Sequence, residues 1–205
     1  SFLKTVRLLT LVAAPFYCGL AVVAAPMVET LFGTKWLGMA PYIQLLSLAL
    51  LVMTVQILFA PVNNALGKPS LSMFASLGGA FIFPTAFLIG ANWGLEGIAW
   101  AWLVAAPLLL LVTARLSAPL IGVSLLDIGR AMLPGLAPAL VMAIGVGVAE
   151  QSLGALGWAA PIRLALLVAM GVALYAALLW LLEREAIAEV SRLVIRRRPP
   201  VQDAI

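Results

Sequence analysis

Long apolar stretches separated by short polar breaks run through most of the chain. Each is close to the roughly 20 residues that an α-helix needs to cross the hydrocarbon core of a bilayer. The pattern predicts an all-α integral membrane helical bundle of six transmembrane helices, over residues 8–32, 41–66, 71–91, 95–113, 128–149 and 161–182.

The polar breaks carry ordinary helix-ending signals. Gly67, Lys68 and Pro69 close the second span, because glycine supplies a left-handed cap and proline cannot continue a helix. The short turn 92–94 predicts a tight hairpin between the third and fourth spans. The less hydrophobic segment 116–127 is expected to lie at the membrane interface before the fifth span.

The last segment, 183–205, differs from the rest because charged residues dominate it. Ile187, Val190, Leu193 and Val194 share one helical face, which predicts an amphipathic helix on the cytoplasmic membrane surface followed by a basic tail. Three arginines at 196–198 could each gain about 1 kcal/mol from anionic membrane lipid. The alternative is a tail that only fixes the topology.

The distribution of Lys and Arg predicts the orientation, since cytoplasmic loops carry an excess of both. With the N-terminus inside, ten of the twelve basic residues face the cytoplasm and two, Lys35 and Arg163, face outward. We therefore expect a multi-pass protein of the bacterial cytoplasmic (inner) membrane with both ends of this chain in the cytoplasm.

Composition supports the membrane prediction. Apolar residues make up 64% of the chain and charged residues 10%, against about 25% charged in soluble domains. The net charge of +4 is explained by topology, so no nucleic-acid partner is expected.

Because the chain begins at Ser1 and its first span is too long for a signal peptide, we expect a preceding part to be missing.

Signatures of enzymes are not found in the sequence. The chain has no histidine, and its one cysteine, Cys18, lies in an apolar span where it is expected to pack. The run 65–70 around Lys68 lacks the spacing of a phosphate-binding loop. We expect no catalysis by this chain alone, no cofactor and no metal.

The second span carries more amide side chains than any other, at Gln44, Gln56, Asn63 and Asn64. Amides are costly in lipid, so they should face protein or water. Gln56 and Asn63 are seven residues apart and would share a helical face. They could line a substrate cavity, since amides both donate to and accept from sugar hydroxyls, or they could form interhelical hydrogen bonds.

Prolines recur inside the spans, and each tends to bend its helix. Pro61 is the best candidate for a hinge because it lies beside the amides. No acidic residue lies at the middle of a predicted span, and Glu29 and Glu96 lie near outer ends, where an interfacial role is expected rather than ion coupling.

An ordered set of short signatures resembles the C-terminal half of a bacterial polysaccharide flippase. This is the polysaccharide transport family of the multidrug/oligosaccharidyl-lipid/polysaccharide flippase superfamily. The resemblance covers residues 8 to about 115 and is carried by Leu31, Phe32, Gly33, Lys35 and Trp36, by Ala40 and Pro41, by Ala65 to Lys68, and by Gly94 to Trp100.

The resemblance implies a parent of two lobes, with this chain as the second lobe and a missing N-terminal lobe as its partner. Such a carrier moves undecaprenyl-diphosphate-linked oligosaccharide across the inner membrane during lipopolysaccharide or exopolysaccharide synthesis. Its cavity uses cations for the diphosphate, a role open here to the missing lobe or to Lys68 or Arg130. The alternatives are a multidrug-type small-molecule extruder, a membrane-embedded polyprenyl-glycan polymerase or ligase, and a structural scaffold.

Overall fold

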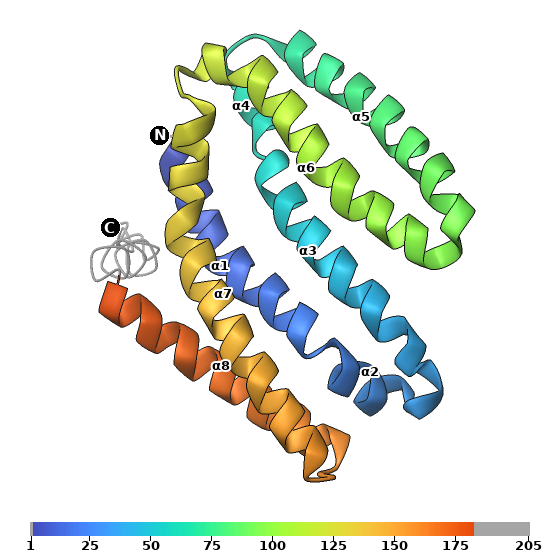
Figure 1. The fold of residues 1–205 in the computed structure, drawn as a ribbon. Coiled ribbons are helices and arrows are strands. Elements are labelled where there is room, and N and C mark those ends of the chain that lie inside the picture. Colours follow the sequence, from blue (N-terminus) through green and yellow to red (C-terminus); the bar gives the residue numbers. More distant parts are fainter. Residues whose placement is uncertain (1, 183–205) are drawn as a thin grey trace, which may run out of the picture.

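The computed structural model describes residues 2–182, which fold into long α-helices joined by short turns (Figure 1). Within this range there is no strand, and the all-α prediction is confirmed. The elements are α1 (Phe2–Val22), α2 (Ala24–Phe32), η1 (Thr34–Met39), α3 (Ala40–Gln56), α4 (Phe59–Ala65), α5 (Pro69–Gly90), η2 (Ala91–Trp93), α6 (Gly94–Ile121), α7 (Leu125–Ala155) and α8 (Ala160–Leu182). The predicted surface helix and tail, 183–205, lie outside the described residues.

Five stretches of the described chain are long and apolar enough to cross a membrane. One of them, Pro69–Ile121, has 53 residues and contains both α5 and α6, which η2 joins as a hairpin. The six predicted spans therefore each fall on one helix or on two consecutive helices. Long apolar helices of this kind are those of a membrane helical bundle.

The long helices stand side by side in the order α5, α6, α3, α1, α7, α8 (Figure 1). Short α2 continues α1 and packs on α8. The start of α1 and the α4–α5 and α6–α7 turns lie at one end of the molecule, here called the Lys68 end. The other end, called the Arg163 end, holds η1, η2 and the α7–α8 turn.

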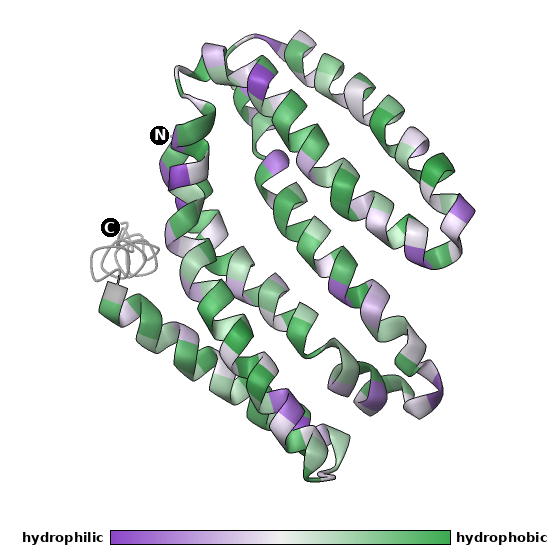
Figure 2. Cartoon of the chain, viewed as in Figure 1, coloured by the Kyte–Doolittle hydropathy of each residue, from purple (hydrophilic) through white to green (hydrophobic). Residues whose placement is uncertain are grey.

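The most hydrophilic residues lie mainly towards these two ends, whereas the helices between them are mainly hydrophobic (Figure 2). Among the described basic residues, Lys35 and Arg163 lie at the Arg163 end. The others lie towards the Lys68 end, at Lys4, Arg7, Lys68, Arg115 and Arg130. This grouping agrees with the predicted topology, and which end faces the cytoplasm stays a prediction.

Two prolines interrupt their helices one turn ahead of their own positions. The break between α1 and α2 lies at Val23, and the break between α3 and α4 lies at Ile57 and Leu58. A proline clashes with the carbonyl of the residue four positions earlier, which is residue 22 for Pro26 and residue 57 for Pro61. The predicted spans 8–32 and 41–66 are therefore each divided between two helices.

The region between the predicted fourth and fifth spans is mostly helical. The helix α6 continues past Thr113 to Ile121, and α7 begins at Leu125. The place of residues 116–127 at the membrane interface stays a prediction. Ser117 and Ala118 are buried in this continuation, so packing rather than hydropathy extends the helix. Gly122, with φ of 74°, ends α6 in the left-handed conformation that glycine favours.

A capping box starts α7. The Ser124 hydroxyl accepts a hydrogen bond from the Asp127 backbone N–H, and the Asp127 carboxylate accepts one from the Ser124 backbone N–H. This arrangement satisfies two donors that a helix start otherwise leaves free. It explains why α7 begins so soon after α6 ends.

The largest buried cluster lies where α1, α7 and α8 meet, and it includes Cys18, Ala139, Met142 and Leu167. The prediction that Cys18 packs inside the protein is confirmed. Gly135 allows close contact, because a Cβ there would lie 2.7 Å from the backbone of Thr10. The α1–α7 pair is thus held by small residues, as is usual for helices in membranes.

One hydrogen bond ties α8 to α1. The Tyr175 hydroxyl donates to the backbone carbonyl of Leu11 over 2.7 Å, and the bond is buried. That carbonyl has no intrahelical donor because the residue four positions later is Pro15, which lacks an N–H. The tyrosine therefore satisfies an acceptor that proline leaves free.

Candidate functional site

A cleft of about 440 Å³ lies between α1, α3 and α7. Its walls are mostly small or apolar side chains, with Cys18 and Ala21 from α1 and Ala143 and Gly147 from α7. Because these side chains are short, the helices leave space between them. The polar groups that line the cleft are those of Gln44, Glu150 and Gln151.

The polar groups come from two helices and lie near the Arg163 end. Gln44 lies in the second turn of α3, whereas Glu150 and Gln151 lie in the last two turns of α7. Two amides supply both donors and acceptors, and a carboxylate supplies acceptors alone. This set of groups suits a ligand with many hydroxyls.

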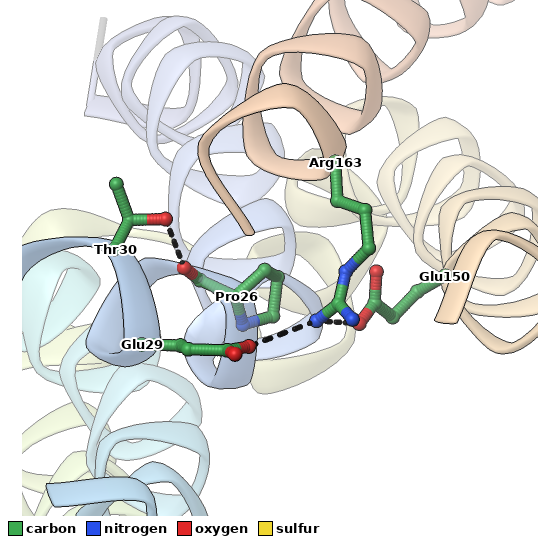
Figure 3. Close-up of polar contacts among 5 residues, drawn as sticks. All are labelled: Pro26, Glu29, Thr30, Glu150 and Arg163. Atoms are coloured by element: carbon green, nitrogen blue, oxygen red, sulfur yellow. Dashed lines mark hydrogen bonds and ion pairs between the residues drawn. The ribbon is translucent and has the colours of Figure 1, made fainter. Parts of the chain in front are cut away.

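Glu150 also belongs to an ion cluster beside the cleft (Figure 3). The guanidinium of Arg163 places Nη2 3.3 Å from Oε2 of Glu29 and 3.2 Å from Oε1 of Glu150. The three residues come from α2, α7 and α8, so the cluster joins three helices at the Arg163 end. In α2 itself, the Thr30 hydroxyl donates to the Pro26 carbonyl over 2.6 Å.

The cluster contains one positive and two negative groups, all largely withdrawn from solvent. The Arg163 side chain is 14% exposed, and Glu150 is 19% exposed. Arg163 Nε and Glu150 Oε2 are buried without a hydrogen-bond partner among the described residues. Removing Arg163 leaves two carboxylates without their cation, which costs more than the loss of an exposed ion pair.

The predicted cavity residues are not brought together. Gln44 lines the cleft, but Asn63 lies 19 positions further along, on the order of 28 Å if the rise were that of a continuous helix. Gln56 is the last residue of α3 and partly buried, and the break at Ile57 and Leu58 separates it from Asn63. The two residues therefore do not share one continuous helical face.

Asn63 and Asn64 make contacts within the protein. The Asn63 side chain is fully buried, and its Nδ2 donates to Ser117 Oγ on α6 over 2.8 Å. Asn64 is exposed, and its Oδ1 accepts from Ser72 on α5 over 3.3 Å. The interhelical alternative thus describes what these two amides do in this structure, and their cavity role stays a prediction.

The remaining predicted residues lie towards the Lys68 end. Lys68 precedes α5 and Arg130 lies in the second turn of α7, both exposed and away from the cleft. Pro61 lies one turn after the α3–α4 break, where a hinge was expected. Within residues 2–182 no three His, Cys, Asp or Glu side chains come together to hold a metal ion.

The sequence did not identify Glu150 or Gln151 as site residues. It also did not predict that Arg163 forms ion pairs with residues of other helices. Glu150 falls one position beyond the predicted fifth span, and Arg163 opens the sixth. Opposite charges on the two sides of one short turn are a signal for an ion pair across a helical hairpin. The contact of Arg163 with Glu29 has no such local signal, because 134 positions separate them.

Comparison with known proteins gives one family match. Residues 1–41 match a family model described as "Polysaccharide biosynthesis protein". No curated protein and no solved structure gives a significant match. The matched part runs from the start of the chain through α1, α2 and η1 to the first residues of α3, and so includes Glu29 of the ion cluster. In this segment the chain is similar to proteins of polysaccharide biosynthesis, which supports a role in polysaccharide synthesis or transport.

Proposed function

We propose that this chain is part of a membrane carrier that moves undecaprenyl-diphosphate-linked oligosaccharide across the bacterial inner membrane. The observation that carries the proposal is the amide-lined cleft between α1, α3 and α7. The family match over residues 1–41 and the resemblance of the short sequence signatures support it.

In this proposal the cleft contacts the glycan and not the diphosphate. Glu150 gives the cleft a carboxylate, and its charge is shared through Arg163 with a second carboxylate, Glu29. A diphosphate would meet electrostatic repulsion there, whereas sugar hydroxyls can donate to carboxylate and amide oxygens. Lys68 and Arg130, at the other end of the molecule, remain the cationic candidates for the diphosphate.

A carrier must open alternately to the two sides of the membrane, and broken helices are common in such proteins. The breaks before Pro26 and Pro61 divide two helices, α1–α2 and α3–α4, that pack against each other. A change of angle at these breaks would move the Arg163 end relative to the Lys68 end. Pro61 is the proposed hinge of α3–α4.

The proposal is tested by glycan export in the bacterium that carries the gene. Gln44→Leu and Gln151→Leu remove both amide functions from the cleft with little change in volume. We expect each to lower surface glycan and to raise the lipid-linked precursor inside the cell. Asn92→Leu is the matched control, since this amide is exposed and outside the cleft.

Membrane abundance of each variant is measured beside export, so that loss of protein is distinguished from loss of transport. Full export by the Gln44→Leu and Gln151→Leu double variant at normal abundance would refute a glycan role for the cleft. Efflux of a cationic dye that depends on Gln44, with glycan export unchanged, would instead favour the small-molecule extruder.

A further inference from the structure

A second and larger hollow lies on the α5–α6 hairpin. It is a groove of about 890 Å³ along the halves of the two helices near the Arg163 end. Large apolar side chains such as Phe81, Ile89 and Val104 line it and are exposed by 73%, 55% and 62%. Buried small residues, among them Ala101 and Ala105, also line it. The groove is therefore a trough with a floor of small residues and apolar sides.

The one carboxylate and the two indole rings of this groove lie in one part of it, and Thr85 on α5 adds a hydroxyl. Trp93, the last residue of η2, lines it together with Glu96 and Trp100 of α6, which are four residues apart and so lie on one face of that helix. A carboxylate beside two indole rings is a combination that binds ammonium groups, by charge and by cation–π attraction. The residues that line the groove include no Lys or Arg.

The surroundings of the groove indicate what fills it. Both helices belong to a stretch that is long and apolar enough to cross a membrane. In the described part of the chain, α5 packs on α4, α6 and η2 and stands at the edge of the row of helices (Figure 1). An apolar trough on such a surface is filled by lipid chains, because water is absent from the hydrocarbon core.

We propose that this groove binds phosphatidylethanolamine, a phospholipid without net charge whose head group carries a primary ammonium. Its acyl chains lie along Phe81, Val104 and Leu108, and its ammonium group lies at Glu96 between Trp93 and Trp100. The charge of Glu96 selects against anionic head groups, which find no cation in the groove. This site is separate from the proposed glycan cleft, so either proposal can fail without the other.

Glu96 and the two tryptophans also have ordinary structural roles, and the test must distinguish these roles from an amine-binding site. Glu96 in the first turn of α6 stabilises the helix dipole, and tryptophans prefer membrane interfaces. Those roles predict no preference among lipids with the same acyl chains. The amine site predicts a preference that depends on both the carboxylate and the indoles.

The test uses the purified protein, delipidated in detergent, with three dioleoyl lipids that carry ethanolamine, choline or glycerol head groups. Native mass spectrometry measures the affinity of each. We expect phosphatidylethanolamine to bind about fivefold more tightly than phosphatidylglycerol, the ratio that corresponds to about 1 kcal/mol for a cation–π and carboxylate site. Equal binding of the two, or tighter binding of phosphatidylglycerol, overturns the proposal. So does tighter binding of phosphatidylcholine than of phosphatidylethanolamine, because a quaternary ammonium cannot donate a hydrogen bond to Glu96.

Substitutions in the groove test whether the preference for the ethanolamine head group arises there. Glu96→Gln and Trp100→Leu should each remove the preference for ethanolamine, while Glu96→Asp, which keeps the charge, should retain most of it. Trp158→Leu is the control, because this tryptophan lies at the same end of the molecule but outside the groove. An unchanged preference in Glu96→Gln overturns the proposal, and thermal unfolding of each variant shows that it is folded.

Discussion

The hydrogen bond from Tyr175 to the carbonyl of Leu11 allows a sharp test of how proline and packing are linked. Tyr175→Phe removes the hydroxyl and leaves the ring in place. The Leu11 carbonyl then has no donor, because Pro15 supplies none. We expect α8 to be held less firmly on α1.

The expected loss of stability depends on how deeply the hydrogen bond is buried and on how well its groups find other partners in a membrane. Tyr175 is 8% exposed and the bond is 2.7 Å long. A buried acceptor left without a partner costs about 1–3 kcal/mol, whereas interhelical hydrogen bonds measured in membranes average about 0.6 and reach about 1.7 kcal/mol. We therefore expect Tyr175→Phe to lower the free energy of unfolding by about 1–2 kcal/mol.

The assay is equilibrium unfolding in mixed micelles, in which SDS is increased and tryptophan fluorescence reports the transition. The control is the same substitution in a Pro15→Ala background. There the backbone N–H of residue 15 can donate to the Leu11 carbonyl, so loss of the tyrosine hydroxyl should cost less than about 0.5 kcal/mol. An equal loss in both backgrounds would refute the reasoning that proline creates the need for Tyr175.

Two further substitutions test the ion cluster and the α5–α6 crossing by the same unfolding measurement. Arg163→Met should lower the free energy of unfolding by about 2–3 kcal/mol, between the values for exposed and buried pairs, whereas Lys35→Met, which removes an exposed charge at the same end, should change it by less than about 0.5 kcal/mol. Similar losses in the two variants would contradict a role for the cluster in joining α2, α7 and α8. Gly97→Ala should lower stability by about 1–3 kcal/mol because its Cβ would collide with the Gly90 carbonyl, while Gly78→Ala should be neutral or stabilising, since its Cβ would meet only Val112 Cγ1 at 3.6 Å. If Gly97→Ala is as stable as the unchanged protein, the close crossing of α5 and α6 is wrong.

Hydropathy predicted most of the fold, because the apolar length of a segment by itself shows whether that segment can cross a membrane. Each of the six predicted spans falls on one helix or on two consecutive helices, and Gly67–Pro69 and the turn 92–94 marked two of the turns. Prolines were expected to bend their helices, and breaks do precede Pro26 and Pro61, whereas Pro15, Pro84 and Pro107 lie inside helices that continue through them. The continuation of α6 to Ile121 was missed because it depends on Ser117 and Ala118 packing against other helices.

The candidate site was predicted only in part, because it depends on which helices are neighbours. Gln44 was identified from its amide, but its companions in the cleft are on α7 and not on its own span. Asn63 has the same chemistry as Gln44, yet it meets Ser117, 54 positions away, and is buried. A single sequence shows that an amide must find a partner in the membrane, and it does not show which helix supplies that partner.

The ion cluster also has a consequence for the order of synthesis. Arg163 follows Glu29 by 134 residues, and chains are made at about 5–20 residues per second. Glu29 therefore enters the membrane on the order of ten seconds before its cation exists, and Glu150 arrives shortly before Arg163. Until α8 is made, α2 and α7 each carry an uncompensated carboxylate near the same end of the molecule. Insertion machinery or water has to shelter these charges, and the arrival of Arg163 on α8 completes the packing of helices that were made long before it.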